Sequence, residues 1–300
     1  MQPSLAVPPS AGIEVIQHYG LYIEAGPDLE DPIVRQLSDR VVCAHAPWML
    51  PDSTIPGLRL HLASVDPQLR TTAIETIDRY IQRAHALFDN LKLIVTHAAP
   101  HYFPHPPVRP NPNQPRPPLR PDLARWDLLL DSLARLARRC QNLHLQLAVE
   151  NNWAYWDGLP DQADPARLGP GDFLEYFCTD PDQWLSLPQQ LGQPNVSCCL
   201  DPSHAAPYCH RFADHTQRRQ VLARFIARPE LIGHIHWNDS DIHDSRGKAD
   251  LHLCVGSGTL GPAFHAAIKA RAIALAHPVT LEHFYDPQQL ERELAYIASL

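Results

Sequence analysis

Apolar positions follow two different periods along the chain, and the two periods alternate. Short runs of aliphatic and β-branched residues predict buried strands. We predict such strands at 12–18, 41–44, 92–96, 143–149, 196–200, 231–236 and 278–281. The run Leu5-Ala6-Val7 is a candidate for an eighth strand, although the sequence leaves no room for a helix before Gly12.

Between these runs the apolar residues follow a helical spacing. The clearest case follows Asp66-Pro67, since aspartate is a favoured N-cap and proline a favoured first-turn residue. Its apolar stripe comprises Leu69, Ala73, Ile77, Ile81, Ala84 and Phe88. Further helices are predicted at 30–39, from 121, at 172–178, 181–191 and 215–228, from 262, and at 287–298. Alternating strands and helices indicate parallel βαβ units, so we predict an α/β fold, a (β/α)8 TIM barrel with a degraded first βα unit.

Residues 100–121 interrupt this alternation within what we predict to be a single domain over residues 1–300. They contain ten prolines together with Arg109, Arg116 and Arg120, a composition typical of an extended loop. Because the loop follows the strand that ends at His97, we expect it to emerge at the catalytic end of the barrel. There it would form a lid that admits a small ligand and excludes duplex DNA. The alternative is a solvated insertion.

Composition narrows the functional classes. The formal net charge is −8, so bulk electrostatics do not attract this chain to nucleic acid, although a local basic rim or metal ions could reverse the field. The N-terminus lacks the features of a signal peptide, and no apolar run is long enough to span a membrane. Seven cysteines without a CxxC pair do not indicate a disulfide framework. We therefore expect a cytoplasmic protein with no membrane partner.

Histidines and carboxylates stand where the predicted strands end. In a parallel barrel these ends meet at one rim, where active sites lie. The residues at these ends and in the loops that follow them are His45, His97, Glu150, Asp201, His204, His236, Asp250, His252 and Glu282. Such a set would be unsatisfied without a cation, and its imidazoles and carboxylates suit zinc, with manganese or iron as alternatives. Nine ligands predict two or three ions. For His236 alone, the competing interpretation is a hydrogen-bonded core histidine.

The sequence resembles the xylose isomerase-like TIM barrels, and within them the endonuclease IV branch, AP endonuclease family 2. The matching motifs are His45-Ala-Pro-Trp, Ile94-Val-Thr-His97, Val149-Glu150-Asn, Leu200-Asp201-Pro-Ser-His204, His236-Trp-Asn-Asp239, Asp250-Leu-His252 with Gly256-Ser-Gly258, and Leu281-Glu282. The resemblance implies that Glu150, Asp201, His236 and Glu282 would suffice for a single-metal isomerase. It also implies that the other five residues would complete a three-zinc site.

Three functions are compatible with these residues. The first, and our preferred expectation, is metal-assisted hydrolysis of a phosphoester in a small sugar-like substrate or in abasic nucleic acid, with Glu150 and Glu282 as catalytic residues. The second is a sugar or sugar phosphate isomerase or epimerase that uses the same two glutamates as acid and base. The third is a non-catalytic metal-binding scaffold. The number of tightly held ions distinguishes the first two.

Side chains beyond the ligand set are candidates for substrate binding. Trp48, Trp153, Tyr155 and Trp156 follow strand ends and could stack on a sugar or a base, or could pack within their loops. Arg109 could clamp a phosphate, or could belong to a solvated loop. We expect a small-molecule partner, a sugar or phosphorylated sugar, in preference to DNA. The sequence indicates nothing about oligomeric state.

Overall fold

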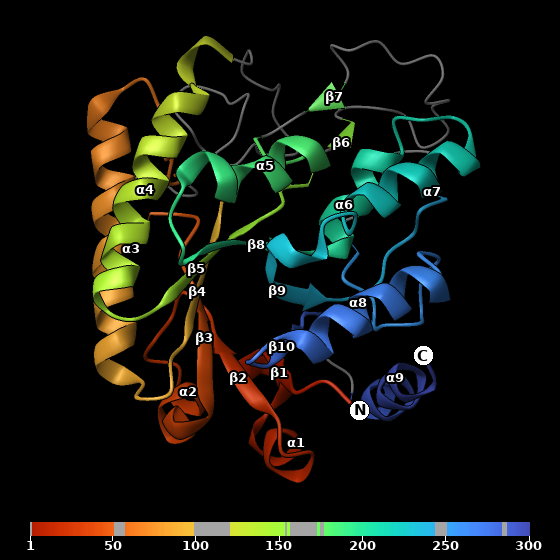
Figure 1. Ribbon diagram of the computed structural model, residues 1–300. Helices are drawn as coiled ribbons and strands as arrows, with labels where there is room; N and C mark the ends of the chain where they lie inside the picture. The colour runs from red at the N-terminus through yellow and green to blue at the C-terminus, as the bar shows by residue number, and fades with distance from the viewer. Residues whose placement is uncertain are drawn as a thin grey trace.

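The computed structural model contains a closed barrel of parallel strands surrounded by helices (Figure 1). It describes residues 2–50, 58–98, 121–153, 155–156, 173–174, 177–243, 251–283 and 287–300. Within these residues the eight barrel strands, in chain order, are β1 (Leu5–Val7), β2 (Tyr22–Ala25), β3 (Val41–His45), β4 (Leu93–His97), β5 (Gln146–Glu150), β8 (Val196–Leu200), β9 (Ile232–Trp237) and β10 (Val279–Leu281). Strand β1 pairs with both β10 and β2, which closes the barrel and confirms the predicted fold.

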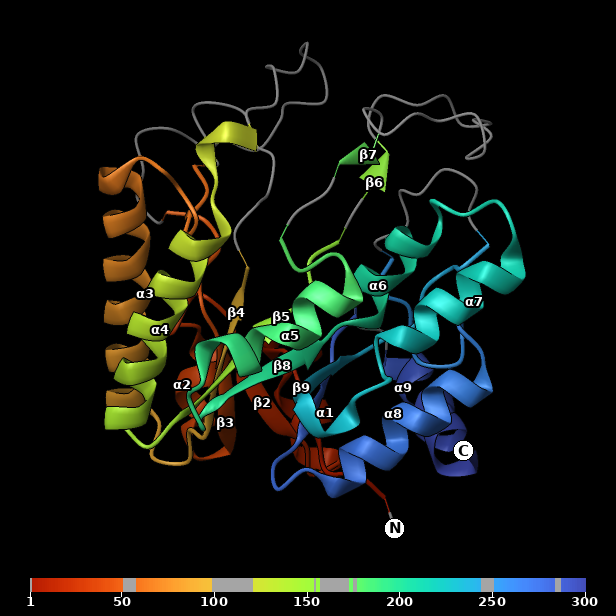
Figure 2. The ribbon, with the colours of Figure 1, turned by 45° about the horizontal axis from the view of Figure 1, so that its top comes forward.

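A helix follows every barrel strand, and these helices form the outer layer seen in both ribbon views (Figures 1 and 2). They are α1 (Ile13–His18), α2 (Pro32–Gln36), α3 (Pro67–Leu87), α4 (Trp126–Asn142), α5 (Pro181–Leu191), α6 (Pro202–Cys209) with α7 (His215–Arg224), α8 (Pro262–Ala274) and α9 (Pro287–Ser299). The predicted start of α3 is confirmed, because Asp66 Oδ1 accepts the backbone N–H of Gln68 at 2.8 Å. Among the helices of the described residues, none combines the length and apolarity that crossing a bilayer requires.

The first βα unit differs from the prediction. Residues 12–18, predicted as a strand, form helix α1 instead, and the strand is Tyr22–Ala25, which the sequence analysis missed. The first unit is therefore short but complete rather than degraded. The prediction was wrong at residues 12–18 because a short apolar run carries no periodicity long enough to separate a strand from a helix. Here Gly12, at φ 87°, starts the helix after a single 3-10 turn.

Two further predictions are corrected. The predicted helix at 172–178 is absent at its start, where Phe173–Leu174 forms β7 and pairs antiparallel with β6 (Tyr155–Trp156). The helix predicted from 121 begins five residues later, at Trp126, after a 3-10 turn at Pro121–Leu123. The proline-rich segment with Arg109, Arg116 and Arg120 lies outside the described residues, so the predicted lid is untested.

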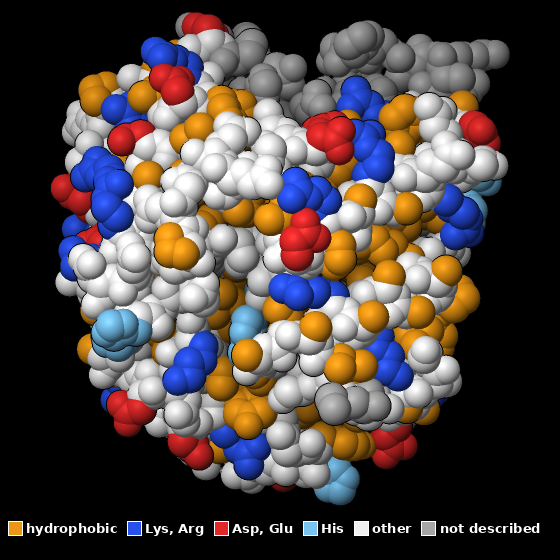
Figure 3. Space-filling view, in the orientation of Figure 1, with side chains coloured by type: hydrophobic (Ala, Val, Ile, Leu, Met, Phe, Trp, Pro, Cys, Tyr) orange, Lys and Arg blue, Asp and Glu red, His pale blue; other side chains and the backbone are white. Residues whose placement is uncertain are grey.

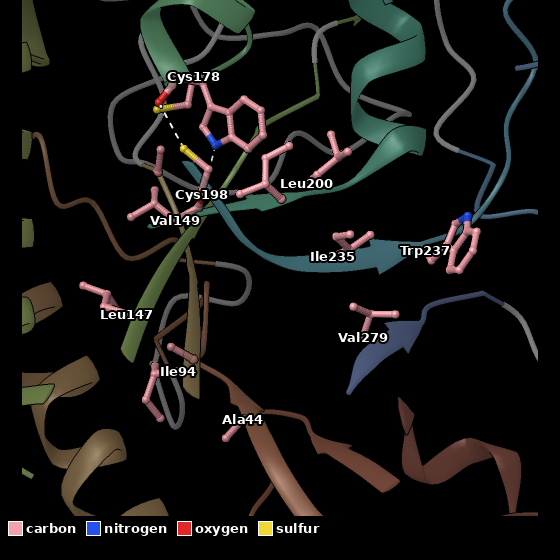
Figure 4. Close-up of a cluster of buried hydrophobic side chains, with 14 of the residues drawn as sticks. Ala44, Ile94, Leu147, Val149, Cys178, Cys198, Leu200, Ile235, Trp237 and Val279 are labelled. Atoms are coloured by element: carbon pink, nitrogen blue, oxygen red, sulfur yellow. Dashed lines mark hydrogen bonds between the residues drawn. The ribbon is translucent and has the colours of Figure 1, made fainter. Parts of the chain in front are cut away.

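The barrel strands present two kinds of surface. Their outward side chains, among them Leu147, Val149 and Ile235, pack beneath the helices (Figure 4). The helix layer also bonds to the strands directly, because Trp184 of α5 donates its indole N–H to the carbonyl of Val149 at 2.9 Å. Inside the barrel the apolar filling is a separate small cluster of Val42, Cys43, Leu93, Val95, Ala148 and Cys199. The remaining interior positions toward the carboxyl ends of the strands are polar, and these form the site.

Candidate metal centre

The carboxyl ends of neighbouring strands bring the predicted residues to one rim. His45, His97 and Glu150 are the last residues of β3, β4 and β5. Register places His97 beside Glu150 across the β4–β5 pair. On β9, His236 lies beside Thr280 of β10. All of these side chains point inward because residues two apart along a strand share a face.

Glu150 lies at the centre of the histidine cluster and is 1% exposed. Its Oε2 is 3.1 Å from His45 Nε2 and 3.3 Å from His97 Nδ1. Its Oε1 is 3.2 Å from His204 Nδ1 and 3.1 Å from His236 Nδ1. One carboxylate therefore faces four imidazoles. Three of them belong to strands β3, β4 and β9, and the fourth, that of His204, belongs to helix α6, which follows β8.

Asp201 organises the second half of the site. Its Oδ1 accepts the backbone N–H of His204 at 3.1 Å, which caps helix α6, and the Asn238 amide at 3.1 Å. Its Oδ2 has no hydrogen-bond partner among the described residues. That atom is 3.8 Å from both His204 Nδ1 and His252 Nε2. The cap fixes the carboxylate so that one oxygen faces the cavity.

Glu282, directly after β10, completes the rim from the opposite side. Its Oε2 is 2.9 Å from His236 Nδ1 and 3.8 Å from His252 Nδ1. His252 itself is held with φ 43°, in the left-handed region that only a few per cent of non-glycine residues adopt, with histidine, asparagine and aspartate enriched among them. Backbone strain of this kind persists where surrounding contacts enforce it, and it is concentrated at functional sites. Asp250, two residues earlier, lies outside the described residues.

Burial and neighbouring imidazoles set the charges of the carboxylates. Burial alone would raise the pKa of Glu150, but the imidazoles of His97, His236 and His204 hold that pKa well below its ordinary range. Burial likewise acts against ionisation of Glu282, yet His236 and His252 lower its pKa to about 2. Asp201 differs, because burial dominates there and raises its pKa to about 6.

The pKa values of the imidazoles also shift in opposite directions. Burial lowers the pKa of His97 to about 3, so this ring is neutral and its lone pairs are available. Burial opposes the charged form of His236 as well, but Cys199, Glu24, Glu282 and Glu150 around it raise its pKa well above the ordinary value. His97 is thus in the neutral state that a metal ligand requires, whereas the raised pKa of His236 means that a cation binding there would displace its proton.

The polar atoms of the rim fit a divalent cation. Among the described residues, Asp201 Oδ2 is buried without a hydrogen-bond partner, and His97 Nδ1 and Glu282 Oε2 have close contacts with Glu150 and with His236 but no hydrogen bond of good geometry. Buried polar atoms are normally hydrogen-bonded, so these three atoms are suited to bind a divalent cation. The candidate ligand groups made of predicted rim residues include His45–Glu150–His236, His97–Glu150–His204 and Asp201–His204–His252; Glu24–Cys43–His234 is a further group inside the barrel. The three rim groups share Glu150 and His204, as neighbouring ions in one cluster would.

A cavity of about 280 Å³ opens above these residues. It is lined by Trp48 and Trp153, both predicted to bind substrate, and by Arg59, which the sequence analysis missed. The Arg59 guanidinium lies 5.7 Å from the centre of the Trp153 ring, and Trp48 is 42% exposed. The volume is at the small end of ligand pockets, which run from about 300 to 1000 Å³. It suits a small molecule.

Eight of the nine predicted rim residues come together in the structure; the ninth, Asp250, is not described. Glu24 is a buried carboxylate of β2 that contacts His236 Nε2 at 3.0 Å and was not predicted from the sequence. Its strand is four residues long, too short to show a period, so the sequence carried no usable signal. Arg59 also carried no usable signal, since the sequence around it shows no hydrophobic periodicity. Arg109 lies outside the described residues.

Comparisons with known proteins agree with this architecture. No curated protein sequence matches the chain. A D-tagatose 3-epimerase-like protein superposes with a TM-score of 0.62 at 16% identity, covering 100% of this chain and 99% of its own. The 3-keto-D-glucoside 4-epimerase YcjR from E. coli gives 0.59 at 17% identity, covering 100% of each chain. The IOLI protein with a bound zinc atom gives 0.61 at 14% identity, covering 100% and 98%.

At these identities the solved structures establish a shared fold. The sequence comparison goes further, because residues 12–300 match the family described as xylose isomerase-like TIM barrels. The match spans every barrel strand except β1 and includes all of the rim residues described above. This chain belongs to the xylose isomerase-like TIM barrel family.

Proposed function

We propose that this protein is a metal-dependent sugar isomerase or epimerase in which Glu150 and Glu282 exchange a proton with the substrate. The observation that carries the proposal is the convergence of the two carboxylates on one imidazole. His236 Nδ1 is 3.1 Å from Glu150 and 2.9 Å from Glu282, and both glutamates line the cavity. Two glutamates that approach one point from different strands can reach opposite faces of a small substrate.

The cation proposed here, zinc with manganese, magnesium or iron as alternatives, would be held by Glu150, Asp201, His236 and Glu282. When bound, it supplies Lewis-acid polarisation of a substrate carbonyl or hydroxyl oxygen, which makes the neighbouring C–H more acidic. Because the pKa values of Glu150 and Glu282 lie below their ordinary range, both side chains are carboxylates near neutral pH and can accept a proton.

The reaction needs one proton to leave carbon and one to return. One glutamate carboxylate takes the proton from the carbon next to the carbonyl, and the electron pair of that C–H bond moves toward the oxygen. The other glutamate must first take up a proton from solvent, and it then gives that proton to the opposite face of the carbon, which inverts the centre; the first glutamate releases its proton to solvent and both become carboxylates again. Trp48 and Trp153 would cover the sugar, and Arg59 would bind a hydroxyl or phosphate oxygen.

The test uses solvent isotope exchange. Protein reconstituted with Zn²⁺, Mn²⁺ or Mg²⁺ is incubated in D₂O with a panel of keto-sugars and their phosphates, and the sugars are analysed by NMR and mass spectrometry. We expect a new stereoisomer carrying one deuterium at the inverted carbon. Glu150→Gln and Glu282→Gln should each lower the rate by at least about a hundredfold, since each removes one proton carrier.

His144→Asn is the matched control. His144 is exposed, precedes β5 at the opposite end of the barrel and has φ 58°, a conformation that asparagine accepts. Its rate should equal that of the parent. Absence of deuterium incorporation with every metal and every keto-sugar would refute the isomerase proposal.

A second candidate is metal-assisted phosphoester hydrolysis. The observation in its favour is the number of ligands, because His45, His97, His204 and His252 exceed what one ion needs. The similarity to solved epimerases and the small cavity favour the first proposal. Release of inorganic phosphate from sugar phosphates, or incision of abasic duplex DNA, without isotope exchange would instead support hydrolysis.

A further inference from the structure

Glu24 is a buried carboxylate that the proposed reaction leaves without a role. It is the third residue of β2, points into the barrel beneath the rim and is 5% exposed. A buried carboxylate is costly unless it is hydrogen-bonded or paired with a cation. Its contacts therefore indicate what holds it there and what it holds in turn.

The two oxygens of Glu24 share one neighbour, His236, and otherwise differ. Oε2 accepts the hydroxyl of Thr280 at 2.7 Å and lies 3.1 Å from His234 Nε2 and 3.2 Å from Cys43 Sγ. His236 Nε2 is 3.0 Å from Oε1 and 3.3 Å from Oε2. Three side chains thus fix Oε2 inside the barrel, and Oε1 is the oxygen closer to the imidazole of the rim.

The two nitrogens of His236 are divided in the same way. Nε2 faces Glu24, while Nδ1 faces Glu150 and Glu282 at 3.1 and 2.9 Å. A carboxylate has no proton to donate when ionised, so the proton of a neutral His236 belongs on Nε2. Its lone pair then belongs on Nδ1, which points into the candidate metal centre. In proteins, a ligating histidine whose second nitrogen donates to a carboxylate is held in one tautomer and one orientation.

We propose that Glu24 is a positioning residue, which accepts the Nε2–H of His236 and so holds the Nδ1 lone pair toward the metal. The proposal rests on the metal centre of the proposed function. It assigns Glu24 no contact with the substrate and no part in proton transfer. It also explains why β2 places a carboxylate inside the barrel, although the other three residues of this strand are apolar or aromatic.

Glu24→Gln tests the proposal with almost no change of shape. The Thr280, His234 and Cys43 side chains around Oε2 favour the amide oxygen at that position, which turns the NH₂ toward His236 Nε2. An amide donor there requires Nε2 to accept, so the imidazole proton moves to Nδ1 and blocks the metal. We expect at least one Zn²⁺ binding step to weaken about 10- to 100-fold, measured by competition with a chromophoric chelator.

Cys43→Ala is the matched control. It removes a neighbour of Glu24 from the same buried network but leaves the contact between Oε1 and His236 intact. Its Zn²⁺ affinity should equal that of the parent. Circular dichroism and the melting temperature of the metal-free proteins show whether each variant is folded.

A measurement on the unaltered protein keeps the proposal testable if Glu24→Gln does not fold. In the zinc-loaded protein, ¹⁵N NMR of the histidine rings should show His236 protonated at Nε2 and metal-bound at Nδ1, with the signal assigned by its loss in His236→Asn. Zinc binding with unchanged affinity in Glu24→Gln, or a proton on Nδ1 of His236, would overturn the role of Glu24 alone. Failure of the unaltered protein to bind zinc would overturn the metal centre and this inference with it.

Discussion

Burial alone does not separate the candidate metal ligands from structural histidines in this protein. His236 and His61 are both almost fully buried. The difference is in their neighbours, because His236 faces carboxylates on both ring nitrogens, whereas His61 Nδ1 accepts the backbone N–H of Ala63 at 3.2 Å. His61 therefore has a structural contact that requires an unprotonated Nδ1, and we predict a role in stability rather than in activity.

This role predicts a specific pH dependence. Burial lowers the pKa of His61 to about 3, below the ordinary value of 6.5 that the unfolded chain retains. Between these two values the unfolded state binds the proton and the folded state does not. The stability that His61 contributes is therefore complete above about pH 6.5 and is lost as the pH falls toward 3.

His61→Asn should flatten this dependence, because the asparagine side-chain oxygen can accept the same N–H two residues on and does not titrate. From pH 7 to pH 5 the free energy of unfolding of the parent should fall by about 2 kcal/mol more than that of the variant. Urea unfolding at both pH values measures the difference. Equal losses in the two proteins would show that His61 does not contribute to the acid sensitivity.

At the scale of elements, the loop that carries His252 is held by one buried aspartate. The carboxylate of Asp239 accepts backbone N–H groups from Ser240, Gly256, Gly258 and Leu260 at 2.8 to 3.3 Å. The backbones of Asp239 and Leu253 also bond to each other in both directions, at 2.7 and 2.9 Å. These bonds fix the segment after β9 close to the rim.

Helix α9 supports the same loop from outside. Glu293 accepts the backbone N–H of Val255 at 2.7 Å with one oxygen, and its other oxygen is 2.8 Å from His283 Nε2. His283 directly follows Glu282, and Val255 comes three residues after His252. Glu293 therefore contacts the chain close to two rim residues. The last helix of the barrel therefore contributes to the position of the site without contacting the cavity.

Gly258→Ala tests how tightly this loop is packed. A Cβ at Gly258 would lie 2.3 Å from the Ser240 carbonyl oxygen and 2.5 Å from Asp239 Oδ1, so the loop must move. We expect a loss of about 1 to 3 kcal/mol in the free energy of unfolding, as for other overpacked sites, together with weaker zinc binding. Gly26→Ala is the control, since nothing lies within 4 Å of its added Cβ. A Gly258→Ala variant as stable as the parent would mean that the loop adapts freely.

At the scale of the whole molecule, the barrel concentrates acidic and imidazole groups at one end, while the face drawn in Figure 3 is mixed in charge. On that face, lysine and arginine side chains are interspersed with aspartate and glutamate, and its described residues form no continuous basic strip of the kind that binds a nucleic-acid backbone. The net charge of −8 likewise does not attract nucleic acid.

Metal content is the corresponding prediction for the intact protein. The rim has ligand groups for more than one ion, but the proposed isomerase needs one, so we expect one tightly held divalent ion per chain, zinc first, in protein purified without chelator. Elemental analysis gives the number, and removal of the ion should lower the melting temperature, because ligands that bind only the folded state stabilise it. Two or three tightly held ions after reconstitution with zinc and manganese would instead support the multinuclear phosphoester hydrolase.

The sequence by itself determined the barrel and most of its rim. Strands such as 41–44, 92–96 and 196–200 were predicted to within a residue or two, because fully buried parallel strands are continuous apolar runs and helices lie between them. The polar residue that ends each run breaks the pattern, which is why His97, Glu150 and Asp201 stood out. Alternation then placed them on one inward face without any knowledge of their contacts.

Only the tertiary structure decided which of these groups meet, and with which atoms. The contacts of Glu150 join four histidines that are 53 to 105 residues away from it. The strand of Glu24 is four residues long and gave no periodic signal. The prediction instead placed a strand at residues 12–18, which form helix α1. Distances between ligand atoms depend on strand register and barrel closure, and these are set by contacts between segments that are remote in sequence. The local sequence pattern therefore does not determine these distances.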